Sequence, residues 1–326
     1  AQLRDGSGFT AGALNALVTA PTAVASVNGG QLAGLRNRII NGQGLIAQRG
    51  PVALTTAYSY GGVDRMLFCI AGGTSISGNA GYGGMPGATG DGYGPSVASW
   101  TTGQAAMQQR IEATNVVDLN SKTITISGKL YQDFGSTRTV VVSLYKPTAL
   151  DNFTTTTLIG TPLNVSVPSA TTTSFAYTLT LGSSDATNGL MVQIYDSAAI
   201  TVTSKIFYVA ELQLERGSVA TTFEQRPIGL ELALCQRYIR PLFANGSMIN
   251  NTLAAVYQDT PSMRTAASPI LTDLQAVIEN YGVAASLAIV DSSVTTKDKF
   301  RSTISFASTG AIGIPVYMTG FISKEL

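Results

Sequence analysis

The sequence predicts a mostly β protein whose main unit is a jelly-roll-like β-sandwich, followed by a smaller β domain. Three observations lead to this prediction. Apolar and polar residues alternate with a period of two over several stretches, which is typical of strands with one buried face. Clusters of Gly, Asn, Asp and Ser separate these stretches, as in antiparallel sandwiches. A single segment near residue 230 changes to the period of a helix.

The alternation is clearest between residues 123 and 214. Apolar side chains at every second position indicate strands that bury one face. The longest run, which is the last one, predicts one continuous apolar face. The apolar positions are Ile124, Ile126 and Leu130; Phe175, Tyr177, Leu179 and Leu181; Leu190, Val192 and Ile194; and Ile206, Tyr208, Ala210, Leu212 and Leu214.

The N-terminal segment is expected to be an extended arm. Residues 1–37 are rich in Gly and Ala and lack a core periodicity, so we expect them to need a partner surface for order. Residues 14–27 end like a signal peptide. However, Asp5 offsets the charge of Arg4, and Pro21 interrupts the apolar stretch, so a secretory signal is not expected.

Near residue 230 the apolar pattern changes from a period of two to that of a helix. Pro227 suits the first position of a helix, where its missing N–H costs nothing. We predict a linker helix over residues 228–240, with an apolar face that needs a covering surface. That face consists of Ile228, Leu232, Cys235 and Ile239.

These patterns divide the chain into four parts. After the linker helix, short alternating stretches return and predict a small C-terminal β domain. The predicted parts are the arm (1–37), the sandwich (38–227), the linker helix (228–240) and the C-terminal domain (241–326).

Charged residues are scarce in this chain. Only 12% of the 326 residues are Asp, Glu, Lys or Arg, against about 25% in typical soluble domains. The formal net charge is +1 and there is no basic run, so neither nucleic-acid binding nor attraction to an anionic membrane is expected. No apolar run approaches the roughly 18 residues of a membrane-spanning helix.

The chain contains no histidine, which removes the usual general base and the commonest ligand of transition metals. No metal site and no cofactor are expected, because the residue spacings of zinc and calcium sites are missing. Cys69 and Cys235 lie in apolar surroundings. Two buried thiols are the favoured interpretation, and a disulfide between them is the alternative.

The glutamates near residue 215 are the remaining candidates for acid–base chemistry. On a regular strand Glu211 and Glu215 share one face and lie about 13 Å apart. A glycosidase pair needs a separation of about 5–9.5 Å, so no catalytic residue is assigned. A second carboxylate from a neighbouring strand remains an alternative partner. The favoured interpretation is that these carboxylates accept hydrogen bonds from the turn that follows.

Residues 72–99 are rich in Gly, and we expect them to form a long functional loop. Tyr82, Tyr93 and Trp100 lie in or beside this segment and are the candidate contacts to a receptor or to another subunit. Alternatively, these aromatic side chains pack the loop onto its own domain. The Gly spacings do not indicate a dinucleotide site, since no helical pattern follows them.

The segment from Ala210 to Tyr238, called the joint segment below, contains a long motif. It reads A-x-x-Q-L-E-x-G-x-x-A-T-x-F-E-x-R-P, followed by E-L-x-L-C-Q-R-Y. Shorter motifs precede it: N-x-x-x-N-G at Asn37 and Asn41-Gly42, Q-R-G at 48–50, and Asp64-Arg65. This set resembles a module that recurs in the fibre and spike proteins of tailed phages. In that family an aromatic residue usually follows Asp-Arg, whereas this chain has Met66, so a sugar site built around that aromatic is not expected.

The resemblance implies a jelly roll like a carbohydrate-binding module within a homotrimeric virion fibre or spike. It also implies that the protein resides in the virion, which is assembled in the cytoplasm of a bacterial host. We expect the arm to bind other virion proteins. The leading function is a tail fibre that attaches the virion to a host-surface glycan or protein without enzymatic activity. The alternative is a head or collar decoration protein with a purely structural role.

A depolymerase spike is disfavoured, because β-helix repeats and a suitable carboxylate pair are both missing. The resemblance also interprets the joint segment as a structural connection between the sandwich and the C-terminal domain. The residues assigned to this structural joint are Gln213, Glu215, Gly217, Phe223, Glu224, Arg226, Pro227, Cys235 and Tyr238.

Overall fold

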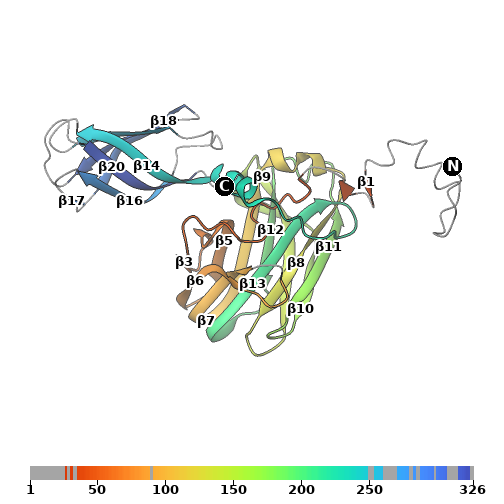
Figure 1. The fold of residues 1–326 in the computed structure, drawn as a ribbon. Helices are drawn as coiled ribbons and strands as arrows, with labels where there is room; N and C mark the ends of the chain where they lie inside the picture. Colours follow the sequence, from red (N-terminus) through yellow and green to blue (C-terminus); the bar gives the residue numbers. More distant parts are fainter. Residues whose placement is uncertain are drawn as a thin grey trace, which may run out of the picture.

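The computed structural model describes residues 26–27, 30–31, 35–88, 91–248, 253–259, 270–278, 282–283, 287–296, 299–306 and 315–323. Most of the predicted arm lies outside these ranges. Its described part includes a short hairpin of β1 (Ser26–Val27) and β2 (Gly30–Gln31), of which β2 contacts the sandwich strand β13. The described chain is mostly β strand, as the sequence predicts (Figure 1).

Eleven antiparallel strands form the β-sandwich, and the long strand β7 belongs to both of its sheets. The first part of β7 pairs with β6 and β13, and the last part pairs with β5 and β12. Thr102, between the two parts, has a φ of +51°, which allows the strand to leave one sheet and enter the other. One sheet has the order β3-β6-β7-β13-β8-β11, and the other has the order β4-β5-β7-β12-β9-β10.

The strand bounds follow the chain order of the sandwich. They are β3 (Val52–Ala53), β4 (Ser59–Gly61), β5 (Val63–Ala71), β6 (Ser75–Gly84), β7 (Asp91–Ile111), β8 (Thr123–Gln132), β9 (Arg138–Ala149), β10 (Asn152–Val167), β11 (Thr173–Thr180), β12 (Leu190–Asp196) and β13 (Ile200–Arg216). Two 3-10 turns, Ala113–Asn115 and Val117–Leu119, connect β7 to β8.

The predicted strands at 123–130, 175–181 and 190–194 are confirmed, but the continuous apolar face over 206–214 is wrong. A β-bulge at Glu211 (φ +52°) shifts the register of β13 against β8. Because one extra residue reverses the alternation, the side chains that face the core change from odd to even positions. Phe207 and Val209 face the core before the bulge and Leu212 and Leu214 after it, whereas Tyr208 and Ala210 pack in a second cluster with Met85 and Tyr131.

The Gly-rich segment is not a long loop, because it forms β6 and the first part of β7, which pair as a hairpin. At Gly94 (φ +150°) an added Cβ would lie 2.2 Å from the carbonyl oxygen of Phe207, so glycine allows β7 to approach β13 closely. Tyr93 is fully buried in the core, so its prediction as a surface contact is wrong. The side chains of Tyr82 and Trp100 lie outside the described part of the structure.

The helix α2 (Ile228–Gln236) is shorter than predicted, because the chain enters the strand β14 at Ile239. Its predicted apolar face is correct only in part. Cys235 is buried with Tyr238, Ile40 and Ile46, and Leu232 packs against this cluster. Ile228 is 57% exposed. Among the described residues, no helix is long and apolar enough to span a membrane.

A second antiparallel sheet follows α2, as predicted for a C-terminal β unit (Figure 1). Its strand order is β17-β16-β20-β14-β15-β19-β18. The strands are β14 (Ile239–Met248), β15 (Leu253–Asp259), β16 (Ile270–Ile278), β17 (Gly282–Val283), β18 (Leu287–Thr296), β19 (Lys299–Phe306) and β20 (Pro315–Ser323).

Candidate functional site: the joint segment

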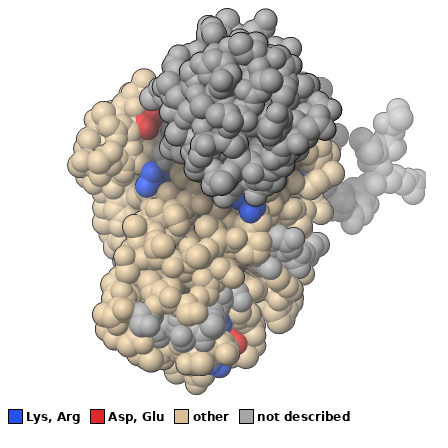
Figure 2. Space-filling model, turned by 90° about the vertical axis from the view of Figure 1, so that its left-hand side faces the viewer, with Lys and Arg blue, Asp and Glu red and all other residues tan. Residues whose placement is uncertain are grey.

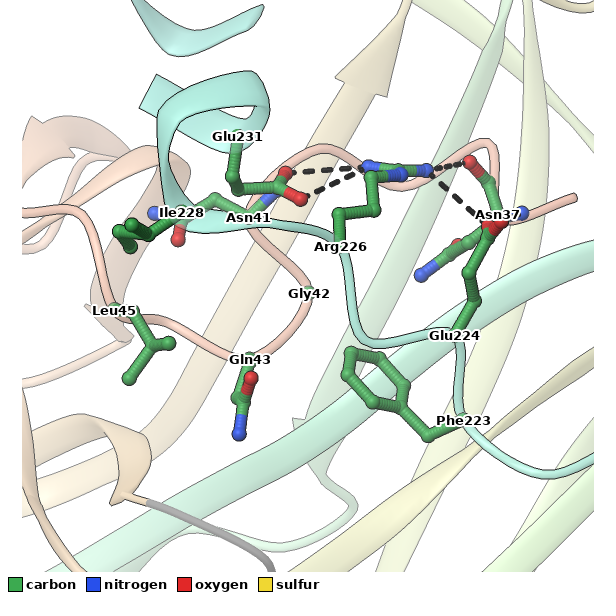
Figure 3. Close-up of a pocket in the computed structure, with 10 residues that line it drawn as sticks. All are labelled: Asn37, Asn41, Gly42, Gln43, Leu45, Phe223, Glu224, Arg226, Ile228 and Glu231. Atoms are coloured by element: carbon green, nitrogen blue, oxygen red, sulfur yellow. Dashed lines mark hydrogen bonds and ion pairs between the residues drawn. The ribbon is translucent and has the colours of Figure 1, made fainter. Parts of the chain in front are cut away.

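The separated motifs meet at one end of the sandwich, beside α2. The chain before β3 passes between β13 and α2, and Figure 3 shows Asn37 and Asn41 from this chain next to Glu224, Arg226 and Glu231 of the joint segment. Residues nearly 190 positions apart in the sequence therefore form one hydrogen-bonded unit.

Glu215 at the end of β13 holds the turn that follows the strand. Its side chain is buried, and Oε1 accepts hydrogen bonds from the Thr221 backbone N–H at 2.8 Å and from Gln213 Nε2 at 2.9 Å. Its Oε2 accepts a bond from the Thr221 hydroxyl at 2.7 Å. Gln213 Oε1 in turn accepts the backbone N–H of Glu224 at 2.8 Å. Both side chains thus position the chain between β13 and α2.

Arg226 connects the joint segment to the chain that precedes β3. Its side chain is 4% exposed, and Nη1 lies 3.2 Å from both carboxylate oxygens of Glu231. Nη1 also donates to the Ile39 carbonyl oxygen at 3.1 Å, and Nη2 donates to the Asn37 carbonyl oxygen. The planar guanidinium suits this arrangement because it directs several donors at fixed angles (Figure 3).

Asn37 and Asn41 hold their own segment in place through both backbone and side-chain groups. The Asn37 backbone N–H donates to Glu224 Oε2 at 2.7 Å, and the Asn41 backbone N–H donates to Glu231. Asn37 Oδ1 accepts the backbone N–H of Leu214 at 3.0 Å. Asn37, which the sequence places at the end of the arm, is therefore buried within the sandwich.

Gly42 explains the glycine of the N-x-x-x-N-G motif. Its carbonyl oxygen accepts the backbone N–H of Leu212 at 2.9 Å. An added Cβ would lie 2.1 Å from the Leu212 carbonyl oxygen, so any larger residue would push this segment away from β13.

The shorter motifs Q-R-G and Asp64-Arg65 also contact the joint segment. Asp64 accepts hydrogen bonds from the backbone N–H of Gln48 at 3.1 Å and from its Nε2 at 2.6 Å. Burial raises the pKa of the Asp64 carboxyl, and the bonds from Gln48 act in the opposite direction. Arg65 is buried and stacks on the ring of Tyr238, with the guanidinium carbon 3.6 Å from the ring centroid.

Tyr238 is the last residue of the long motif, and charged side chains surround its ring. Burial raises its pKa to about 12, although the positive charge of Arg65 opposes this rise. Nearby, Arg237 forms an ion pair with the buried Glu112 at 3.0 Å. These contacts fix the end of α2 against the sandwich.

The structure brings together most residues that the sequence assigned to the joint. Gly217 (φ +139°) donates its backbone N–H to Thr123 at the turn after β13, and Pro227 precedes the first residue of α2. The sequence motifs include Asn37 and Glu231, but neither was among the residues assigned to the structural joint. Sequence reasoning did not identify Glu112, the partner of Arg237, because no pattern indicates it.

Two cavities of the described structure border the joint segment. The one in Figure 3 has a volume of about 20 Å³, which is enough for roughly one water molecule. The other, of about 100 Å³, is lined by Leu35, Asn37, Arg38, Ile40, Asn115, Arg226, Leu234 and Arg237. Glu215, Glu224 and Glu231 each accept hydrogen bonds within the joint. In the described part of the chain, no group of three or more acidic, Cys or His residues could hold a metal ion. The arrangement is suited to holding chain segments together.

The cysteines do not form a disulfide: Cys69 lies on β5 and Cys235 on α2, and both are buried thiols. Burial raises the pKa of Cys69 to about 11. This outcome agrees with the favoured interpretation of the sequence.

The fold and the joint together define a mostly β protein with a jelly-roll-like sandwich connected through a hydrogen-bonded joint to a second sheet. No family model matches the chain, and no curated protein matches it. Three of the solved structures that are similar to it are carbohydrate-binding modules. One, of a family 4 module, is 21% identical, covers 54% of this chain and 97% of its own, and has a TM-score of 0.33.

The other two structures are more distant in sequence. A family 16 module is 15% identical, covers 43% of this chain and 86% of its own, with a TM-score of 0.27. The tandem family 22 modules of Paenibacillus barcinonensis Xyn10C are 9% identical and cover 92% of this chain and 99% of their own, with a TM-score of 0.34. These scores are too low for the similarity to support a function.

Proposed function

We propose that this protein is a virion fibre protein of a tailed phage that attaches the particle to the host surface by non-enzymatic binding. The observation that carries the proposal is the joint segment. Its long motif, which resembles that of phage fibre and spike proteins, forms one hydrogen-bonded unit with the shorter motifs of the same resemblance. Motifs that are far apart along the chain are therefore in contact in the folded protein.

The use of the carboxylates supports a binding role over a hydrolytic one. A glycosidase needs one carboxyl that donates a proton and a second that acts as base or nucleophile, both facing a cleft. Glu215 and Glu224 instead accept backbone N–H groups of the joint. Figure 2 shows a broad face of the sandwich with few charged side chains, which suits contact with an uncharged partner.

Labelling of intact particles tests this proposal. Gold-conjugated antibodies against the protein should label the tail tip of phage particles in electron micrographs, and the purified protein should compete with particles for adsorption to host cells. Labelling of the head or collar without such competition would contradict an attachment role and favour the decoration protein. Release of reducing sugar from host glycan by the purified protein would contradict the non-enzymatic role.

A further inference from the structure

The larger cavity at the joint segment is lined by three arginines and by no acidic residue. Its volume of about 100 Å³ gives room for several water molecules or for one small organic group. The wall consists of the cations Arg38, Arg226 and Arg237, the apolar residues Leu35, Ile40 and Leu234, and the amides Asn37 and Asn115. Positive charge and apolar surface therefore meet around one small space.

The three arginines come from separate parts of the chain. Arg38 lies before β3, Arg226 between β13 and α2, and Arg237 directly after α2. Each is held by a carboxylate that does not line the cavity. The pairs are Arg38–Asp118 (2.7 Å), Arg226–Glu231 (3.2 Å) and Arg237–Glu112 (3.0 Å). These ion pairs fix the arginines in advance, so a ligand does not have to order them.

The fold does not use every hydrogen-bond donor of these guanidinium groups. Each guanidinium has five N–H donors, and Arg38 Nε and Arg226 Nε have no partner among the described residues. The side chain of Arg237 is 42% exposed, so a molecule that enters from solvent can reach it. Guanidinium groups match a carboxylate in geometry as well as in charge. The donors of this cavity therefore favour a carboxylate.

The apolar part of the wall is also accessible from solvent. Leu35 is 43% exposed, and the half-buried Leu234 packs against the cluster that contains Cys235 and Tyr238. A short alkyl group would remove this apolar surface from water, whereas an inorganic anion would not. The two parts of the wall together select an acid with an apolar stem.

We propose that this cavity binds one carboxylate group carried on a short apolar stem. The carboxylate binds to Arg38 and Arg237, and the stem contacts the two leucines. This chemistry is shared by a free small organic acid and by an acidic side chain of a neighbouring copy of the chain. The site is separate from any contact to a host receptor, so the inference does not depend on the proposed function.

The test measures binding of isovalerate to the purified full chain by calorimetry and ligand-observed NMR. Isovalerate should bind more tightly than acetate, which lacks the branched stem. Isovaleramide, which lacks the charge, should not bind. Arg38→Gln should weaken isovalerate binding about tenfold, the effect of one lost charge-assisted hydrogen bond. This variant should fold, because the partner Asp118 is half exposed to water.

A second variant acts on the stem alone. Leu35→Ala should bind acetate like the parent protein but lose the preference for isovalerate over acetate. Its fold should be unaffected, since Leu35 is largely outside the core. Arg216→Gln is the matched control: Arg216 is exposed and does not line the cavity, so this variant should bind isovalerate like the parent.

Light scattering distinguishes the two sources of the carboxylate. Dissociation of an oligomer by isovalerate or by Arg38→Gln would assign the carboxylate to a neighbouring copy, whereas binding without such a change would assign it to a free acid. The proposal is overturned if isovalerate does not bind and Arg38→Gln leaves the oligomeric state unchanged. Equal binding of isovaleramide or sulfate, or an equal loss of binding in Arg216→Gln, would also overturn it.

Discussion

Individual side chains of the joint segment explain why a chain with few charges places several glutamates close together. Glu215, Glu224 and Glu231 each accept backbone N–H groups from segments that have no regular secondary structure. Buried backbone groups of this kind need partners, and a carboxylate provides strong ones because its bonds are charge-assisted. The glutamates therefore replace the hydrogen bonds that a sheet or helix would have supplied.

Glu215→Gln should lower the free energy of unfolding by about 1–3 kcal/mol. The glutamine side chain replaces the charge-assisted bonds to Thr221 with neutral ones. Its NH₂ group would also face groups that are themselves hydrogen-bond donors. Urea unfolding followed by circular dichroism measures the change. Asp118→Asn is the matched control: its side chain is 52% exposed in a surface ion pair with Arg38, so the loss should stay below about 1 kcal/mol. Equal losses in the two variants would contradict a structural role for Glu215.

Both thiols should be unreactive in the folded protein. Cys69 and Cys235 are buried, and the raised pKa of Cys69, about 11, leaves little thiolate at pH 8. Ellman's reagent should label neither cysteine rapidly in the native state and should label both after unfolding in guanidinium without a reductant. Absence of free thiols in the unfolded protein would show a disulfide and contradict the structure.

At the scale of single elements, the bulge in β13 connects the core to the joint segment. Before Glu211 the odd positions of the strand face the main core, and after it the even positions Leu212 and Leu214 do so. Without the extra residue, every side chain from Leu212 to Glu215 would point to the opposite face. The bulge thus sets the orientation from which Gln213 and Glu215 reach the joint.

Deletion of Glu211 should prevent stable folding, whereas Glu211→Gly should fold. Glycine adopts the φ of +52° without strain, and the substitution removes the partly exposed ion pair with Lys129. We expect the glycine variant to differ from the parent by less than about 1 kcal/mol in urea unfolding. A deletion variant as stable as the parent would show that the register of β13 adapts and that the bulge does not set it.

The sequence predicts elements better than it predicts contacts. The alternation of apolar and polar residues with a period of two identified β8, β11 and β12, because these strands bury one face without interruption. It failed at Glu211, since one inserted residue leaves no compositional mark. It also failed for the Gly-rich hairpin, where close approach of strands selects the same residue that marks loops. The joint was found through its motif, which includes Glu231, and Asn37 belongs to one of the shorter motifs. The contacts between these motifs, from Asn37 to Glu224 and from Asn41 to Glu231, depend on long-range geometry that period and spacing do not encode.

At the scale of the whole molecule, we predict an interface between chains at the exposed apolar residues of α2. Ile228 and Leu230 are 57% and 40% exposed, and the resemblance to phage fibres implies a trimer. Light scattering of the purified protein should give three times the chain mass. Ile228→Ser combined with Leu230→Ser should shift the equilibrium towards monomer, whereas Val219→Ser, at another exposed apolar position, should not. A stable monomer across micromolar concentrations would contradict trimerisation.

The N-terminal arm should attach the protein to the particle without stabilising the sandwich, and the position of Asn37 makes this testable with two truncations. Removal of residues 1–34 deletes the short contact between β2 and β13 but leaves every contact of Asn37 intact. The melting temperature should therefore stay nearly unchanged while incorporation into virions is lost.

Removal of residues 1–37 also deletes the bonds of Asn37 to Glu224, Leu212 and Leu214. The melting temperature should then fall by several degrees, because about 1 kcal/mol is lost for each buried hydrogen bond. Thermal melts and mass spectrometry of purified particles measure the two effects separately. If the shorter truncation still enters virions, the anchor lies outside the arm, and the C-terminal sheet becomes the next segment to delete.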